Sequence, residues 1–173
     1  MRTCRVSPVN PDSMPLQVNP FAKLPALSHG DLHIFESGAV LLYLHELMSG
    51  ADAAARGRAA SWVMFANSTM GNGLYLEHLR PKELPAIMAG LTSTFADGRQ
   101  YLEPQGFTVG DVAVGGLLLY LPMMFPDLDL TTFPAVTAYM DRLAQRPAYK
   151  ATLGARLASG PAAPPTRGGV PVR

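Results

Sequence analysis

A change of hydrophobic pattern near residue 50 constrains the fold of this 173-residue chain more than any other feature. Before that point, short apolar runs broken by proline and glycine indicate β-strands, which lead into one helical segment. After it, the apolar residues recur only at helical spacing. Strands and a helix followed by helices alone predict an α+β domain, residues 1–50, joined to an all-α domain, residues 53–156. We expect residues 157–173, which are rich in proline and glycine, to form a disordered tail.

The first domain is predicted to contain a β-hairpin and a helix. The apolar runs within residues 26–35 form the hairpin, because Gly30 suits the positive-φ position of a tight turn between them. The helix spans Ser37–Met48, and Gly50 suits the left-handed position that commonly follows a helix end.

Four helices are predicted in the second domain: Ala53–Met70, Leu84–Ala96, Val109–Leu121 and Ala135–Ala148. We expect Pro122 to end the third of them, since proline lacks the backbone N–H that a helix interior needs. The same helix starts with Thr108 and Asp111 at the spacing of a capping box, in which each side chain satisfies a backbone N–H of the other end.

Composition excludes several functions. The formal net charge is only +1 and like charges form no blocks, so nucleic acid is not an expected partner. The longest apolar run, Val112–Phe125, is shorter than the ~20 residues of a membrane-spanning helix, and Met1–Pro8 lacks the apolar core of a signal peptide. One cysteine, Cys4, excludes an internal disulfide, and the four histidines show no metal-ligand spacing. We therefore expect a cytoplasmic protein with neither a membrane anchor nor a metal.

Three segments together resemble the glutathione transferase superfamily. Residues 19–27, NPFAKLPAL, are similar to the family pattern N-P-x-G-K-V-P-A-L, and residues 35–44 contain its E-S-x-A motif followed by Y-L. Residues 101–111, YLEPQGFTVGD, are similar to Y-L-x-G…F-T-x-A-D. The segments occur in family order and cover about residues 4–152. The resemblance implies a thioredoxin-like N-terminal part and an all-helical C-terminal domain.

The resemblance also implies a binding site for glutathione. The Leu24–Pro25 bond is expected to be cis, which turns the backbone N–H and C=O of Leu24 outward to pair with the cysteinyl part of the tripeptide. Lys23 is expected to meet the glycyl carboxylate, although a solvated surface lysine is an alternative. Glu36 is expected to face the γ-glutamyl ammonium, and Ser37 the γ-glutamyl carboxylate at a helix N-terminus, where free N–H groups favour an anion. The alternative for Ser37 is a helix N-cap alone.

Other residues of interest have structural alternatives that we weigh higher. Trp62 and Phe65 are candidates for a cleft between the domains that binds a hydrophobic electrophile, but core packing explains them as well. Thr108 and Asp111 resemble the family's structural cap, and capping accounts fully for their spacing.

The residue that activates the thiol of glutathione is expected to be missing. The family uses a Ser, Tyr or Cys at the start of its first helix, because the thiolate is the nucleophile and a free thiol has a pKa of ~8.5. Only 24 residues precede Pro25. Residues 3–9 resemble the family's second strand and residues 12–18 its second helix. We therefore expect the first strand and helix to be absent and their neighbouring strands to lack a hydrogen-bonding partner. Neither Cys4, Ser7 nor Ser13 occupies a suitable junction.

Two functions follow from these expectations. The first is a glutathione transferase that conjugates the thiolate of glutathione, as co-substrate, to small hydrophobic electrophiles in detoxification, with the activating residue supplied by sequence absent here. The alternative is a non-catalytic module of the same fold, used for dimerisation or protein binding. A thiol enzyme that reduces peroxides or disulfides lacks a suitably placed cysteine. The resemblance implies a homodimer formed across Ser37–Met48 and Ala53–Met70.

Overall fold

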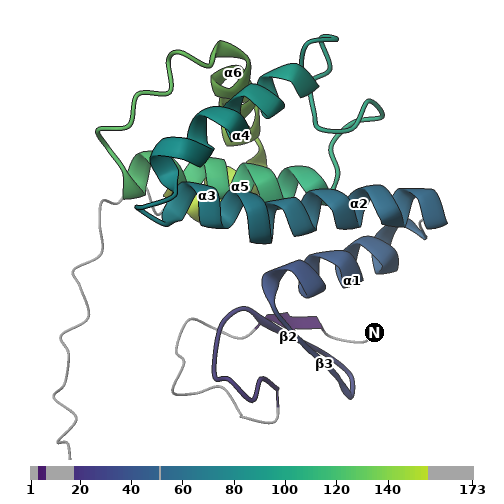
Figure 1. Cartoon of the computed structure of the whole chain (residues 1–173). Helices are drawn as coiled ribbons and strands as arrows, with labels where there is room; N and C mark the ends of the chain where they lie inside the picture. The colour runs from purple at the N-terminus through teal and green to yellow at the C-terminus, as the bar shows by residue number, and fades with distance from the viewer. Residues whose placement is uncertain (1–3, 7–17, 51, 156–173) are drawn as a thin grey trace, which may run out of the picture.

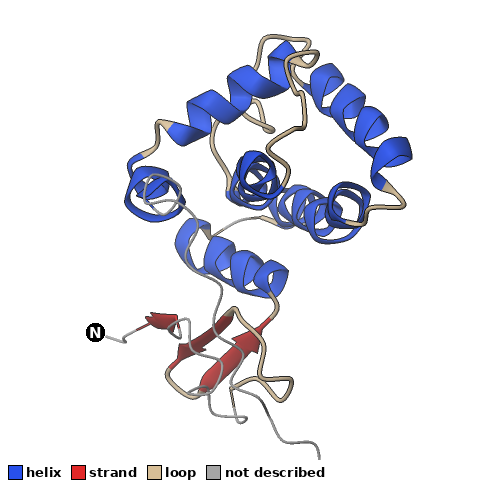
Figure 2. Ribbon diagram, turned by 90° about the vertical axis from the view of Figure 1, so that its left-hand side faces the viewer, coloured by secondary structure: helices blue, strands red, loops and turns tan. Residues whose placement is uncertain are grey.

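The computed structural model describes residues 4–6, 18–50 and 52–155, and it divides into a small sheet, one helix on that sheet and a cluster of helices (Figure 1). Helix α1 (Ser37–Ser49) lies between the sheet and the other helices (Figure 2). The predicted combination of a sheet-containing N-terminal part with an all-helical part is confirmed. The tail 157–173 and most of the predicted second helix, residues 12–17, lie outside the described residues.

The sheet has three antiparallel strands in the order β1 (Cys4–Val6), β2 (Ala26–His29) and β3 (Leu32–Phe35). The β2–β3 hairpin turns at Gly30, whose φ of 62° is the left-handed conformation predicted for it. The expectation that β2 lacks a partner was wrong, because the three residues of β1 pair with Leu27, Ser28 and His29 of β2. This pairing satisfies backbone groups that would otherwise be exposed at a sheet edge.

Helix α1 is attached to the sheet by a side-chain hydrogen bond and ends at a glycine. His29 of β2 and Tyr43 of α1 share a hydrogen bond of 2.6 Å between the ring Nδ1 and the phenolic oxygen. At the C-terminus, Gly50 has a φ of 56° and donates its N–H to the Glu46 carbonyl at 3.2 Å. This left-handed glycine end is the one predicted from the sequence.

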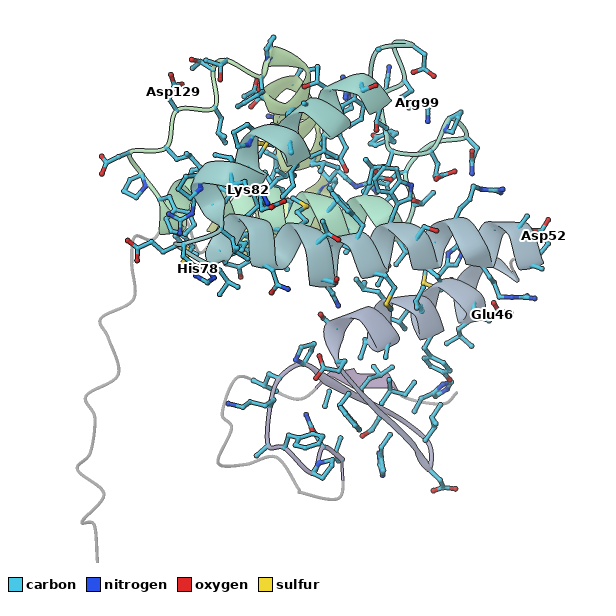
Figure 3. All side chains as sticks on the ribbon, in the orientation of Figure 1. Glu46, Asp52, His78, Lys82, Arg99 and Asp129 are labelled. Atoms are coloured by element: carbon cyan, nitrogen blue, oxygen red, sulfur yellow. The ribbon has the colours of Figure 1, made fainter. Side chains whose placement is uncertain are left out.

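The longest helical stretch consists of α2 (Ala53–Phe65), a π-helical turn η2 (Ala66–Met70) and α3 (Gly71–Tyr75). The predicted end at Met70 was wrong: Gly71 keeps ordinary helical φ and ψ, and the fully buried Leu74 gains from continuing the helix. At the N-terminus, Asp52 accepts from the Ala55 N–H at 2.7 Å, which caps the helix at the end labelled in Figure 3.

Proline affects the boundaries of helices α4 and α5 in different ways. Helix α4 (Arg80–Thr94) begins earlier than predicted, because Pro81 lies in the first turn, where a missing N–H costs nothing. Helix α5 (Val109–Met124) continues through Pro122, so the predicted stop was wrong. That proline lies in the last turn and removes one hydrogen bond, while the fully buried Leu121 beside it keeps the helix packed.

The last predicted helix was too long. Helix α6 (Pro134–Ala144) ends before Pro147, and the chain restarts as α7 (Pro147–Tyr149) and a π-helical turn η3 (Lys150–Gly154). Arg146 has an extended ψ of 137°, as expected for a residue that precedes proline.

One hydrophobic core lies among the helices after residue 52. It is built from buried side chains of α2, η2, α3, α4, α5 and α6, with the ring of Tyr139 at 4.8 Å from that of Phe95. In the described part of the chain, none of the helices has the length and apolar character needed to cross a membrane.

Candidate functional site

The loop before β2 is held in one conformation by Asn19, which is almost fully buried. The Asn19 side chain accepts from the Phe21 N–H at 2.9 Å and donates to the Lys23 carbonyl at 2.7 Å. Its own carbonyl accepts from the Ala22 N–H at 3.0 Å. A buried amide that bridges both arms of a loop fixes the backbone on either side. The path of the chain into Leu24 is therefore set by Asn19.

The Leu24–Pro25 peptide bond at the end of this loop is cis, as the resemblance implies. Leu24 is exposed, and its backbone N–H and C=O form no hydrogen bond with the described part of the chain. Lys23 beside it is also exposed. A peptide ligand can pair with unpaired main-chain groups next to a strand in the way that a further strand would.

The register of the hairpin brings this loop next to the start of α1. Ala26 pairs with Phe35, so Pro25 and Glu36 lie one residue beyond a hydrogen-bonded pair of neighbouring strands. Because the two strands are antiparallel, the start of β2 lies beside the end of β3. The sequence-predicted residues Lys23, Leu24 and Pro25 are thus brought close to Glu36 and Ser37 at the end of the β2–β3 strand pair.

Glu36 has a backbone conformation that non-glycine residues rarely adopt. Its φ is 70° and its ψ is 127°, and it stands directly before α1 without using its side chain as a cap. Such conformations cost of order 1–3 kcal/mol and are concentrated at binding and active sites. The exposed Glu36 carboxylate forms no ion pair with any described residue. The uncapped N–H groups of α1 therefore remain available to an anion.

Ser37 is the first residue of α1, and the N-cap position belongs to Glu36. The alternative in which Ser37 acts only as an N-cap was therefore wrong. The Ser37 hydroxyl instead accepts a hydrogen bond of 3.3 Å from the side-chain amide of Asn67, which belongs to η2. Gly38 permits this approach, since a Cβ built on it would lie 2.6 Å from the Asn67 Nδ2 atom.

Trp62 and Phe65 line a cleft of about 350 Å³ with residues of α4, including Ile87, Gly90 and Leu91. Their rings meet edge to face at 6.0 Å, and both are half-buried against the core. The lining comes wholly from the helical part, so the predicted position between the domains was wrong. One α-helical turn is 3.6 residues, which puts Trp62 and Phe65 on the face of this helix opposite Asn67, the residue that contacts Ser37.

Thr108 and Asp111 form the capping box at the start of α5. The Asp111 carboxylate accepts from the Thr108 N–H at 2.7 Å, the Leu102 N–H at 3.0 Å and the Tyr139 hydroxyl at 2.9 Å. Burial, followed by the charge of Asp111 and this hydrogen bond, raises the pKa of the Tyr139 hydroxyl well above its usual range. These contacts join the loop before α5 to α6, and they account for both residues structurally.

Two residues of the candidate site were missed from the sequence. Asn19 belongs to the motif of residues 19–27, but the motif gave it no role, and only its burial and hydrogen bonds reveal that it holds the loop. Asn67 lies 30 residues from Ser37 and stands beside an apolar stripe, so nothing in the local pattern distinguishes it from a solvated surface residue. In the described ranges, no three His, Cys, Asp or Glu side chains gather where they would hold a metal ion.

Known proteins provide an independent comparison. The family model described as "Glutathione S-transferase, N-terminal domain" matches residues 6–46. A glutathione transferase from Methylococcus capsulatus is 24% identical, with 83% of this chain and 78% of that chain covered and a TM-score of 0.69. A possible glutathione S-transferase from Rhodopseudomonas palustris is 27% identical over 76% and 70% of the two chains, with a TM-score of 0.63.

A third similar structure is that of Ure2p5 from Phanerochaete chrysosporium, cocrystallised with 1-(S-glutathionyl)-2,4-dinitrobenzene. It is 22% identical and covers 83% of this chain and 79% of its own, with a TM-score of 0.66. No protein with a curated description matches this sequence.

Proposed function

Because the chain has the fold and the N-terminal sequence pattern of the glutathione transferase superfamily, we propose that it binds glutathione and serves its conjugation to small hydrophobic electrophiles. The observation that carries this proposal is the juxtaposition of the cis Leu24–Pro25 segment with the uncapped N-terminus of α1. The first offers main-chain hydrogen-bonding groups to an extended peptide, and the second offers free N–H groups that can bind the carboxylate of that peptide.

Each part of the tripeptide has a matching group in this proposal. The Leu24 N–H and C=O pair with the cysteinyl residue, and Ser37 with the first N–H groups of α1 holds the γ-glutamyl carboxylate. Glu36 faces the γ-glutamyl ammonium, and Lys23 faces the glycyl carboxylate. Both of these charged side chains are exposed and unpaired within the described residues, which leaves them free for a ligand.

Conjugation requires that the cysteinyl thiol lose its proton before its sulfur attacks the electrophile. The described residues of the site are assigned to the backbone and the two ends of the tripeptide, and none of them to its sulfur. We therefore propose that the group stabilising this thiolate lies outside the described residues. The Trp62–Phe65 cleft faces away from Ser37, so we do not assign it to the electrophile. Detoxification in the cytoplasm is the role we infer for such an activity.

Calorimetric titration with glutathione tests the proposal. We expect the chain to bind glutathione, and Ser37→Ala to weaken binding about tenfold or more, since hydrogen bonds to a charged group contribute roughly 1.5–3 kcal/mol. Turnover of 1-chloro-2,4-dinitrobenzene, followed as formation of the glutathionyl product, then tests conjugation. Absence of glutathione binding would overturn the proposal and favour the non-catalytic module, whereas binding without turnover would overturn conjugation alone.

A further inference from the structure

The π-helical turn η2 places one polar side chain against the start of α1. Asn67 follows Val63 by four residues, and both side chains lie toward Gly38. π-Helical turns are rare and occur frequently at functional sites. Asn67 is exposed, and its amide has one hydrogen-bond partner in the described part of the chain, the Ser37 hydroxyl.

This contact determines which hydrogen-bonding groups of the Ser37 hydroxyl remain free for a ligand. A serine hydroxyl carries one O–H donor and two acceptor lone pairs, whereas the nitrogen of an asparagine amide only donates. Since Asn67 donates to Ser37, it occupies a lone pair and leaves the O–H free. A hydroxyl that already accepts a hydrogen bond is polarised and becomes a better donor to the next acceptor.

Gly38 makes the arrangement possible. An added Cβ would lie 2.6 Å from Asn67 Nδ2 and 3.1 Å from Val63 Cγ1, closer than such atoms normally approach. The amide is the end of a flexible side chain and would be displaced, so a Cβ at position 38 breaks the contact without breaking the helix. The glycine therefore maintains the distance between Asn67 and Ser37.

We infer that Asn67 is a positioning residue of the tripeptide site, and that its amide turns the Ser37 hydroxyl into a directed donor for the α-carboxylate of a γ-glutamyl group. The inference rests on the proposed function. In this inference, Asn67 and Gly38 contribute to the selectivity of the site for ligands that carry the α-carboxylate. It also distinguishes Asn67 from a residue that contacts the ligand by itself, because its effect passes through Ser37.

A double-mutant cycle measured by calorimetry tests this inference. We expect Asn67→Ala and Gly38→Ala each to raise the dissociation constant of glutathione about fivefold, the scale of one neutral hydrogen bond. In a Ser37→Ala background, Asn67→Ala should cause no further change, since the group through which it acts is gone. The matched control is Asn72→Ala, because Asn72 is also exposed in this helical stretch and has no side-chain hydrogen bond among the described residues.

A ligand without the carboxylate separates positioning from a general structural role. With 4-aminobutyryl-cysteinyl-glycine, which lacks only the α-carboxylate of glutathione, Asn67→Ala should bind as well as the wild type. Equal weakening for both ligands, additivity with Ser37→Ala, or no effect of Asn67→Ala on glutathione would each overturn the inference. A wild type that binds no glutathione shows instead that the proposed function itself has failed, and the inference fails with it.

Discussion

At the scale of single residues, two positions near the candidate site have left-handed backbone conformations. Ala22 has a φ of 49° in the loop held by Asn19, and Glu36 has a φ of 70° before α1. An L-residue pays roughly 1–2 kcal/mol for such a conformation, because its Cβ approaches the following carbonyl oxygen. The family pattern quoted above has glycine at position 22, where this chain has alanine.

Replacing Ala22 by glycine should therefore stabilise the protein. Removing the strained φ is expected to stabilise the folded chain by roughly 1–2 kcal/mol. Glycine loses more backbone entropy on folding than alanine, which costs roughly 0.5–1 kcal/mol. We therefore expect the free energy of unfolding to rise by up to about 1 kcal/mol. Urea unfolding measures the change. The matched control is Ala89→Gly in the exposed face of α4, which should destabilise by about 1 kcal/mol. Equal destabilisation by both substitutions would contradict the strain assigned to Ala22.

The residues of the candidate site were predictable to the extent that they belong to contiguous motifs. Lys23, Leu24 and Pro25 lie in one motif and Glu36 and Ser37 in another, and the hairpin register puts the two together. Asn67 was not predictable, since its partner is 30 residues away and the contact depends on how closely two helices approach. A sequence pattern reports the face on which a residue lies, but not the neighbour that it meets.

At the scale of helices, adjacent glycines in α5 have opposite roles. Gly115 packs against Leu143 of α6, and an added Cβ would overlap that side chain. At Gly116, an added Cβ would have no described atom within 4 Å apart from its chain neighbours and the nearby backbone of α5 itself. The first glycine therefore allows α5 and α6 to approach closely, whereas the second has no packing requirement.

Alanine substitutions should consequently change stability in opposite directions. Gly115→Ala overpacks the α5–α6 interface and should lower the free energy of unfolding by about 1–3 kcal/mol. Gly116→Ala removes the entropic cost of glycine within a helix and should raise it by up to about 1 kcal/mol. Denaturant unfolding of the two variants provides the comparison. A loss of stability in both would show that the face of α5 bearing Gly116 is also closely packed.

Tyr75 links α3 to α5 and makes the stability of this link depend on pH. Its hydroxyl donates to the Leu117 carbonyl at 2.8 Å, and burial, with a smaller contribution from Tyr120, raises its pKa from 10.0 to about 12. The unfolded chain loses this proton near pH 10 and the folded chain near pH 12. The contribution of Tyr75 is therefore complete below pH 10 and is lost as the pH rises toward 12.

The variant Tyr75→Phe tests this dependence. It should be less stable than the wild type at about pH 8, because the Leu117 carbonyl loses its donor, and its stability should fall less between about pH 8 and about pH 11. Urea unfolding at both pH values measures the difference. Parallel losses in wild type and variant would assign the alkaline effect to other groups, such as Tyr139, whose pKa is also raised.

The helix boundaries show what sequence patterns determine at this scale. Helix α6 ends before Pro147, although the predicted helix Ala135–Ala148 ran through that proline, whereas α5 continues through Pro122, where a stop was predicted. The difference is one of packing: Leu121 beside Pro122 is fully buried, whereas α7 contributes no buried side chain. Local propensity fixes the cost of a proline, and tertiary contacts decide whether the helix continues.

At the scale of the whole molecule, α1 connects the sheet to the helical core and exposes apolar side chains on its outer surface. Met48 is 84% exposed and Leu47 53%, and Met64 of α2 is 51% exposed. Large apolar side chains that are exposed on the surface can mark interaction sites. They support the expectation, implied by the resemblance, that two copies associate across Ser37–Met48 and Ala53–Met70.

Sedimentation velocity tests this association. We expect a species of about twice 18.5 kDa, and conversion to the monomer when Met48 and Met64 are both changed to glutamate. Met123→Glu is the control, because Met123 is partly exposed on a different helix, α5. A wild type that sediments only as an 18.5-kDa species would exclude the dimer.

The order of sheet, helix and helical cluster was predictable, since each part has its own hydrophobic period. The pairing of β1 with β2 was not, because a three-residue strand carries too short a pattern to specify its partner. The position of the Trp62–Phe65 cleft was also unpredictable, as it depends on the packing of α2 against α4.

In the proposed function, the loop at Pro25 and the start of α1 form one binding site for glutathione. Titration of the ¹⁵N-labelled protein with glutathione, followed by backbone amide chemical shifts, locates that site directly. Our expectation is that the largest shifts occur at Leu24, Ser37 and Gly38, with little change at Gly90 and Leu91 in the cleft lined by Trp62. Shifts concentrated at Gly90 and Leu91, with Leu24 and Ser37 unmoved, would contradict it.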